Sequence, residues 1–338
     1  MLVDLRSDTV TRPTSEMRRA MADAEVGDDQ YGEDPTVNEL QQLFAELTGK
    51  EEAIFVPSGT MANQIGLQVL TRPGDAVVAG ARQHIVLYEA GAAPVNSGIT
   101  WIPVDDASGA FGPGDVAAAV ERSLHHQPHV SAVAVEDTHM AAGGTVWDLA
   151  ALRSIAEAAR SRGLGVHLDG ARLWHSAVAS GRPLAERAAP GTVVTCALSK
   201  ALGAPAGSLL AGPADLIEEA RVRRKRLGGA MRQIGILAAA GLVAIRTGFD
   251  RLAEDHEHAR RLALAVSDRW PGGLDPSRVQ TNIVLFQHPD PDALIAHLRG
   301  EGVLAGTVAP GVMRFVTHPD VDDAGIEHAS KVIAAAPL

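Results

Sequence analysis

The sequence predicts an α/β fold with a mostly parallel sheet, followed by a smaller α+β domain. Short apolar segments alternate with helical ones through most of the chain, which is typical of a parallel sheet covered by helices on both faces. Several of these segments end in a polar residue, as strands beside a ligand site do. From about Leu242 the pattern changes to a long charged helix and short strands. We expect three parts: an N-terminal arm (1–15), a large domain (16–245) and a small domain (246–338).

Length and composition exclude several classes of protein. The 338 residues suffice for about two domains. Asp and Glu number 41 and Lys and Arg 30, so the formal net charge is −11 and broad nucleic-acid binding is not expected. The one cysteine, Cys196, excludes an intrachain disulfide and a cysteine metal site. The longest apolar segment, residues 234–245, is shorter than the ~18 residues that span a bilayer. We therefore expect a cytoplasmic protein with no membrane contact.

The elements of the large domain follow from local signals. A helix begins at Asp34, an N-cap followed by a proline, and ends at Gly49. Apolar segments predict strands over residues 53–56, 76–79, 132–135, 165–169 and 192–198. Helical spacing predicts further helices over residues 61–70 and 149–160, and a buried helix over residues 234–245.

The small domain begins with a charged helix over residues 251–268, in which His256 and His258 are expected at the surface. Strands are expected over residues 281–286 and 312–316, with a helix near residues 291–299.

Polar residues follow four of the expected strands, where ligands bind in open α/β sheets. Gly59 allows a ligand to approach the backbone, and the helix after it points free N–H groups and its positive dipole end at the same place. The hydroxyls of Ser58 and Thr60 add donors, so this turn can bind a phosphate. An ordinary strand-to-helix turn is the alternative. Glu136, at the end of another strand, is a candidate for a second general acid, but hydrogen-bonding support of the site or capping of its strand is the favoured expectation.

Asp169 and Lys200 end the other two strands. Asp169 is either a helix N-cap or a carboxylate that holds a proton on a ring nitrogen. Lys200 is either a surface residue or a desolvated amine, which has a lowered pKa and can form a Schiff base. A phosphate site, a carboxylate and a lysine together match the three groups of pyridoxal 5′-phosphate (PLP), an electron sink that the protein orients.

The chain resembles the low-specificity L-threonine aldolase family, PLP enzymes of fold type I, nearly from end to end. The motifs that carry the resemblance are DLRSDTVT (4–11), EVGDD (25–29), YGEDPTVN (31–38), FVPSGTMAN (55–63), EDTH (136–139), HLDGARLW (167–174), LSKALGAP (198–205), GGAMRQ (228–233), TNIV (281–284) and RFVTH (314–318). The resemblance implies a mostly parallel seven-stranded sheet flanked by helices in the large domain.

The resemblance also implies roles for individual residues. Lys200 forms the Schiff base with PLP, and Asp169 pairs with the pyridine nitrogen. Residues 58–60 bind the phosphate and His84 stacks on the cofactor ring. The substrate carboxylate is bound by Ser7, Arg172 and Arg314, and Arg172 also lies near the cofactor. Arg232 and Tyr31 reach the cofactor or the site of a neighbouring subunit. The implied assembly is a homotetramer of dimers with shared active sites.

The implied reaction is retro-aldol cleavage of L-threonine or L-allo-threonine to glycine and acetaldehyde. His84, His139 or a water molecule takes the β-hydroxyl proton, and the residues leave this choice open. No metal is expected. The alternatives are β-elimination or transaldolation on the same scaffold, and a non-catalytic PLP-binding protein. Met140 and His175 depart from the family pattern at positions that can alter the pocket for the β-substituent.

Two further clusters have simpler interpretations. His125, His126 and His129 lie around Pro128, so a loop is expected there rather than a metal site. The basic run of residues 221–226 is expected either to neutralise anions near the site or to form a solvated helix face.

Overall fold

The computed structural model describes residues 1–122 and 126–337, and its large domain is built on a seven-stranded sheet. The order across the sheet is β2-β8-β7-β6-β5-β3-β4. The strands are β2 (Glu52–Val56), β3 (Ala76–Gly80), β4 (Thr100–Val104), β5 (Val130–Glu136), β6 (Gly165–Asp169), β7 (Val193–Ala197) and β8 (Ser208–Gly212).

Six of the seven strands run in the same direction. Strands β4, β3, β5, β6 and β7 pair in parallel, whereas β8 is antiparallel to both β7 and β2. Strand β2 therefore runs in the direction of β7, and the carboxyl ends of all strands except β8 meet at one edge. The expected mostly parallel seven-stranded sheet is confirmed.

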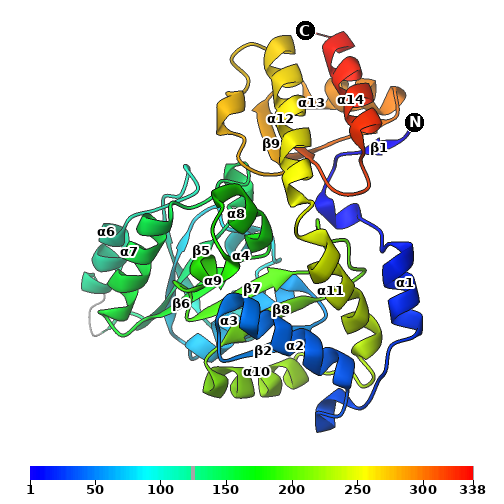
Figure 1. The fold of residues 1–338 in the computed structure, drawn as a ribbon. Helices are drawn as coiled ribbons and strands as arrows, with labels where there is room; N and C mark the ends of the chain where they lie inside the picture. The colour runs from blue at the N-terminus through cyan, green and yellow to red at the C-terminus, as the bar shows by residue number, and fades with distance from the viewer. Residues whose placement is uncertain (123–125, 338) are drawn as a thin grey trace.

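Helices cover both faces of the sheet (Figure 1). One face packs against α2 (Pro35–Thr48), α6 (Pro113–Glu121), α7 (Leu149–Arg160), α8 (Leu173–Ser180), α9 (Leu184–Ala188) and α11 (Gly235–Gly248). The other face packs against α3 (Gly59–Leu70), α4 (His84–Leu87), α5 (Ala92–Ser97) and α10 (Ala214–Arg226). Strand β5 shows the reason: Val133 and Val135 face one helical layer, and Ala132 and Ala134 face the other.

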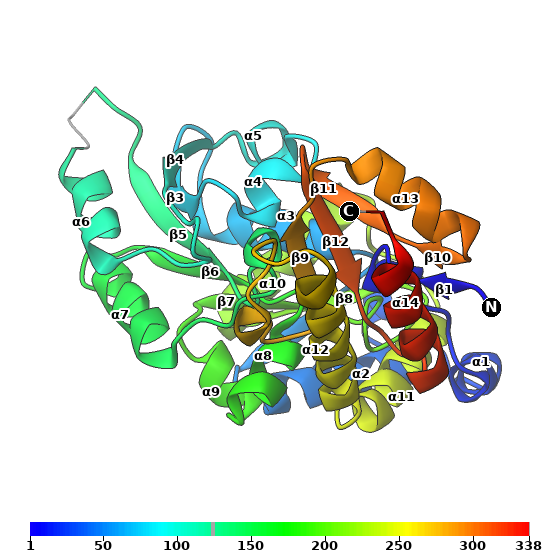
Figure 2. The ribbon, with the colours of Figure 1, turned by 90° about the horizontal axis from the view of Figure 1, so that it is seen from above.

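The small domain holds a three-stranded antiparallel sheet in the order β11-β12-β9. Its elements are α12 (Leu252–Arg269), β9 (Ile283–Gln287), α13 (Pro291–Gly300), β10 (Val303–Leu304), β11 (Gly306–Ala309), β12 (Val312–Val316) and α14 (Asp323–Ala335). The N-terminal strand β1 (Val3–Asp4) pairs with β10, so the start of the chain lies in this domain (Figures 1 and 2). The chain then passes through a short 3-10 helix, η1 (Asp8–Val10), to α1 (Ser15–Ala22), which packs on α11 of the large domain.

Helix starts and ends follow their capping residues. Asp34 caps α2 by accepting a hydrogen bond from Val37 N at 3.0 Å, and Gly49 ends the helix in the left-handed region at φ 64°. Helix α3 begins at Gly59, two residues before the expected start, because Ser58 Oγ accepts from Met61 N. Strand β8 is not among the expected strands, although it completes the sheet between β7 and β2.

The expectation that His256 and His258 lie at the surface is wrong. Their exposed fractions are 3% and 2%. Helix α12 packs against α8 and α14, so the side that carries both histidines is covered. His256 Nε2 lies 2.8 Å from His175 Nδ1 on α8.

The basic run of α10 is largely paired within the chain. Arg221 pairs with Glu52, Arg223 with Glu219, and the buried Arg224 with Asp29. Within the chain, these carboxylates neutralise the three guanidinium groups. Of the three histidines at positions 125, 126 and 129, His125 lies outside the described residues. None of the helices in residues 1–122 and 126–337 is both long and apolar enough to span a membrane.

Candidate active site

The polar residues expected at the carboxyl edge of the sheet do gather there. Asp169 is the last residue of β6 and Glu136 the last of the neighbouring β5, and the two are register partners. Lys200 follows β7 by three residues, and Ser58 follows β2 by two. Because β2, β5, β6 and β7 run in the same direction, all four residues lie along one edge.

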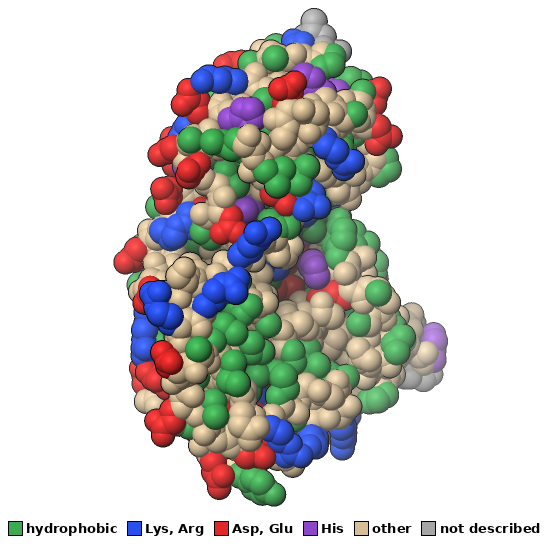
Figure 3. All heavy atoms as spheres, turned by 90° about the vertical axis from the view of Figure 1, so that its right-hand side faces the viewer, with side chains coloured by type: hydrophobic (Ala, Val, Ile, Leu, Met, Phe, Trp, Pro, Cys, Tyr) green, Lys and Arg blue, Asp and Glu red, His purple; other side chains and the backbone are tan. Residues whose placement is uncertain are grey.

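A cavity of about 350 Å³ lies between the two domains next to this edge. Figure 3 shows a hollow between the domains, bordered by Lys or Arg and His side chains. The cavity is lined by Ser7, Thr9, His84, Tyr88, Met140, Arg172, Lys200, Thr307, Val308 and Arg314. It therefore brings together five of the residues that the sequence predicts for the site, from the N-terminal arm, the large domain and the small domain.

Lys200 is the nucleophile candidate of this cavity. Burial lowers the pKa of its ammonium group to about 8, and the positive charge of Arg172 acts in the same direction. The Lys200 carbonyl accepts a hydrogen bond from Thr11 Oγ1 at 2.9 Å, which ties the N-terminal arm to this turn. An amine with this pKa is unprotonated often enough near neutral pH to attack a carbonyl carbon.

Arg172 is held by a buried carboxylate that the site residues predicted from the sequence did not include. Its Nε and Nη2 atoms donate to the two oxygens of Asp8, each at 2.7 Å. Burial alone would raise the pKa of Asp8, but Arg172 outweighs it and holds that pKa well below its usual range. The motif DLRSDTVT contained Asp8, but only the fold shows that it fixes the guanidinium in place.

Arg314 supplies a second cation to the same cavity. Its Nη2 donates to the carbonyl oxygen of Arg6 at 2.9 Å, its Nη1 lies 3.6 Å from Met140 Sδ, and its Nε is buried without a partner. Burial and the nearby charge of Arg172 lower the pKa of Arg314. With Lys200 and Arg172 also present, the cavity is suited to an anion such as a carboxylate.

Asp169 lies behind the cavity and is 1% exposed. Its Oδ2 accepts from Asn63 Nδ2 at 2.9 Å, and its Oδ1 accepts from Ala171 N at 3.1 Å. Among the described residues, one group brings three potential metal ligands within 4.8 Å of one another: His84, Glu89 and Asp169. These three side chains lie together because Glu89 contacts the His84 ring and Asn63 donates to both Glu89 and Asp169.

His84 begins α4 and lines the cavity. Its backbone N donates to Glu136 Oε2 at 2.6 Å, and its ring Nδ1 lies 3.0 Å from Glu89 Oε1. Burial lowers the pKa of His84, but the hydrogen bond to Glu89 and the charge of Asp169 outweigh it and raise that pKa overall. Glu136 also accepts a hydrogen bond from Met140 N at 2.8 Å, so its carboxylate fixes two residues of the cavity wall. This arrangement matches the expected role of Glu136 as a hydrogen-bonding support.

The phosphate turn is accessible at the start of α3. Ser58 and Thr60 are exposed, and their backbone leads into a helix of 12 residues. Ser208 Oγ, on β8, is buried without a partner and lies 3.5 Å from where a Gly59 Cβ would be. An unpaired hydroxyl beside a helix N-terminus fits a phosphate group. Ser208 was missed because nothing in its local sequence separates it from an ordinary strand residue.

Seven residues predicted for the site do not line the cavity: the phosphate turn (58–60), Asp169, His139, Tyr31 and Arg232. His139 is buried, and its Nε2 lies 2.8 Å from Asp106 Oδ2. Tyr31 is 76% exposed, and Arg232 Nη1 donates to Gln30 Oε1 at 2.9 Å on the surface. Within a single chain, His139, Tyr31 and Arg232 do not meet the substrate groups.

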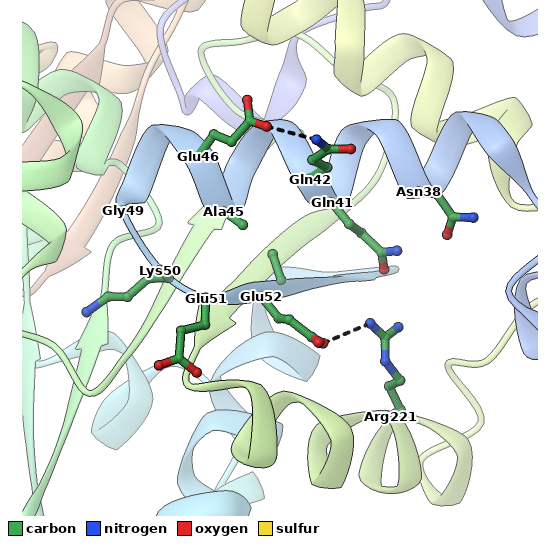
Figure 4. A pocket seen from close by; sticks show the side chains of 11 residues that line it. Asn38, Gln41, Gln42, Ala45, Glu46, Gly49, Lys50, Glu51, Glu52 and Arg221 are labelled. Atoms are coloured by element: carbon green, nitrogen blue, oxygen red, sulfur yellow. Dashed lines mark hydrogen bonds and ion pairs between the residues drawn. The ribbon is translucent and has the colours of Figure 1, made fainter.

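A larger hollow of about 660 Å³ lies between α2, β2 and α10 (Figure 4). Glu52 forms an ion pair with Arg221 at 3.5 Å in this hollow, and the Glu46 carboxylate accepts a hydrogen bond from Gln42 at 2.9 Å. Lys50 extends away and donates to the Gly191 carbonyl at 2.5 Å. None of the predicted site residues lines this hollow.

Comparisons with known proteins identify the family and the fold of the chain. The profile of the beta-eliminating lyase family matches residues 4–289. The low specificity L-threonine aldolase of Escherichia coli (strain K12) is 41% identical over 323 residues, which cover 95% of each chain. A probable low-specificity L-threonine aldolase of Arabidopsis thaliana is 39% identical over 96% of this chain and 94% of its own. The Leishmania major threonine aldolase structure has the same fold, with a TM-score of 0.85 at 22% identity over 98% of this chain and 99% of its own.

Proposed function

Because the chain belongs to the beta-eliminating lyase family, we propose that it is a PLP-dependent lyase that cleaves L-threonine and L-allo-threonine to glycine and acetaldehyde. The observation that carries the proposal is the single cavity in which Lys200, Arg172, Arg314 and His84 meet. An amine nucleophile, two carboxylate-binding cations and an imidazole are the groups that this reaction requires.

The residues at the sheet edge fit PLP. Ser58, Gly59, Thr60 and the unpaired hydroxyl of Ser208 would hold its phosphate. Asp169 would hold its pyridine nitrogen and Lys200 its aldehyde carbon. When bound, PLP supplies an electron sink for the pair released as the Cα–Cβ bond breaks.

The residues of the chain then do the binding and the proton transfer. Ser7, Arg172 and Arg314 bind the substrate carboxylate, and Asp8 keeps Arg172 from moving. Fixing the carboxylate sets the direction of the Cα–Cβ bond in the cavity. His84 lies on the wall of the same cavity and accepts the β-hydroxyl proton. Its position favours it over His139, which points to Asp106 instead.

The proposal includes a cytoplasmic homotetramer of dimers that share active sites. Four large apolar side chains are exposed around the corner where η2 (Asp29–Tyr31) meets α10 and α11: Val26, Tyr31, Val222 and Ile236. Figure 3 shows apolar side chains gathered on the large domain. If a second copy of the chain covers this corner, Tyr31 and Arg232 of the first copy would reach the cavity of the second copy. We expect Lys200→Ala and Arg232→Ala each to be inactive alone and a mixture of the two to regain activity. A monomeric protein, or a mixture that stays inactive, would contradict shared sites.

The decisive experiment measures acetaldehyde released by the purified, PLP-loaded protein from L-threonine, L-allo-threonine and D-threonine in parallel. We expect release from the two L isomers, with glycine as the other product. Pyruvate and ammonia in place of glycine would indicate β-elimination. A yellow protein that turns over none of these would indicate a non-catalytic PLP-binding protein, and a colourless one would exclude PLP.

A further inference from the structure

Glu89 is a buried carboxylate to which the proposed reaction assigns no role. Its side chain is 0% exposed. It receives hydrogen bonds from Asn63 Nδ2 at 2.8 Å and Gln64 Nε2 at 2.7 Å, and His84 Nδ1 lies 3.0 Å from its Oε1. Two of these partners, Asn63 and Gln64, lie on α3, and His84 begins α4. The carboxylate therefore joins two helices beside the cavity.

The contact with Glu89 fixes which nitrogen of His84 carries the proton. An ionised carboxylate only accepts hydrogen bonds, so the neutral imidazole must hold its proton on Nδ1. Its Nε2 then has a free lone pair. The His84 side chain is 32% exposed while Glu89 is covered, so Nδ1 faces the interior and Nε2 is on the cavity side. A lone pair there is what a base for the β-hydroxyl proton needs.

Asn63 extends this arrangement to Asp169. Its amide nitrogen donates to both Glu89 and Asp169, at 2.8 and 2.9 Å. Its carbonyl oxygen is 3.2 Å from the Thr195 hydroxyl and 3.1 Å from His167 Nε2. All four hydrogen-bonding positions of the amide are used, so Asn63 has one orientation and holds the two carboxylates in register.

We propose that Glu89 is a positioning residue that holds His84 in the tautomer with Nδ1 protonated and, through Asn63, keeps this ring in register with Asp169. The first part concerns the protein alone, and its catalytic consequence rests on the proposed function. Glu89 thus serves the base as a buried carboxylate serves the histidine of a Ser-His-Asp triad.

Other charges around His84 set the direction of a pH effect. Glu136 and Asp169 raise the pKa of His84 and Lys200 lowers it, while Tyr88 packs on the ring with centroids 5.7 Å apart. Glu89→Gln removes one negative charge and keeps the shape. The pKa of His84 should therefore fall, and the acid limb of the pH–rate profile should move to lower pH. The carboxylate-binding arginines do not touch Glu89, so KM should change little.

The first test is nitrogen NMR of histidine-labelled protein without cofactor, with the His84 signal assigned by its loss in His84→Gln. In the unaltered protein the neutral ring should carry its proton on Nδ1. In Glu89→Gln the ring should show mixed tautomers and a lower pKa. Glu46→Gln, a matched change in the distant hollow, should leave both unchanged. A proton on Nε2 in the unaltered protein would overturn the proposal without any variant having to fold.

The second test is the pH dependence of acetaldehyde release. Glu89→Gln should lower kcat about tenfold to a hundredfold, within the range of general-base effects, and shift the acid limb downward. An unchanged limb with a raised KM would indicate a merely structural role. The NMR result does not depend on turnover, so the failure of this proposal can be distinguished from the failure of the aldolase assignment.

Discussion

At the scale of single residues, the position of a lysine side chain indicates a nucleophile better than its pKa does. Burial gives both Lys200 and Lys50 a pKa of about 8. Lys200 lines the cavity with two arginines, whereas Lys50 donates to a backbone carbonyl of another loop. A lowered lysine pKa therefore identifies a nucleophile only when a substrate can reach the amine.

These two lysines give a matched test. Lys200→Ala should lower acetaldehyde release by several orders of magnitude, because no amine remains at the cavity to form the Schiff base. Lys50→Ala should retain activity, since its ammonium lies outside the site. The measurement is the initial rate on L-threonine for both variants, with circular dichroism as the check on folding. Equal rates in the two variants would remove Lys200 from the mechanism.

Arg314 should act mainly on substrate binding. Arg314→Leu should raise KM about ten- to a hundredfold, because a hydrogen-bonded charge contributes about 1.5–3 kcal/mol. Arg6→Ala is the control, because Arg314 contacts only the backbone carbonyl of Arg6. Steady-state kinetics on L-allo-threonine separate the two. A KM that stays unchanged in Arg314→Leu would exclude the carboxylate role.

At the scale of elements, capping residues connect helices that are distant in sequence. Asp34 Oδ1 caps α2, and its Oδ2 accepts from Gly235 N, the first residue of α11, at 2.8 Å. The side chain is fully buried. One carboxylate therefore satisfies backbone donors of two helices that pack against each other.

We expect Asp34→Ala to lower the free energy of unfolding by about 2–4 kcal/mol. Loss of an N-cap costs about 1 kcal/mol, and a buried N–H without a partner adds about 1–3 kcal/mol. Asp290→Ala, at the exposed N-cap of α13, removes only the bond to Ala293 N and should cost about 1 kcal/mol. Urea denaturation measures both. Equal losses would show that the contact with Gly235 contributes little.

At the scale of the whole molecule, the N-terminal arm and the two domains complete the site together. The arm supplies Ser7 and Asp8, the large domain Lys200 and Arg172, and the small domain Arg314. Helix α12 carries His256 to His175 on α8 of the large domain, with their ring nitrogens 2.8 Å apart. This buried pair joins the domains behind the cavity.

The histidine pair should make stability fall at acid pH. Burial lowers the pKa of His256 to about 4, and burial and His256 lower that of His175 well below its usual value. The contribution of the two neutral histidines to the free energy of unfolding is complete above about pH 6.5 and is lost as pH falls toward 4. Burial raises the pKa of the neighbouring Asp255 to about 6, so its contribution has the opposite sign and weakens as pH rises through 6.

The variant His256→Gln should therefore lose less thermal stability than the unaltered protein between pH 6.5 and 4.5. His328→Gln is the control, because His328 is half-buried on α14 with its Nε2 2.8 Å from the Glu301 carbonyl oxygen, and this variant should follow the unaltered protein. Thermal unfolding across this range provides the measurement. A parallel decline in all three proteins would show that the pair does not titrate with unfolding.

The sequence by itself determined the parallel strands, the edge where the candidate site lies, and Asp169 and Lys200 at the ends of two strands. These features are local, because strands alternate with helices and polar residues follow the strand ends. The motifs shared with the L-threonine aldolase family, rather than any local pattern, indicated Arg172, Arg314 and His84. Only the tertiary structure decided that Asp8 holds Arg172, 164 positions away, or that Glu89 is joined through Asn63 to Asp169. It also buried His256 and turned His139 toward Asp106. The physical reason is that such contacts depend on how separate elements pack, which no local pattern of residues records.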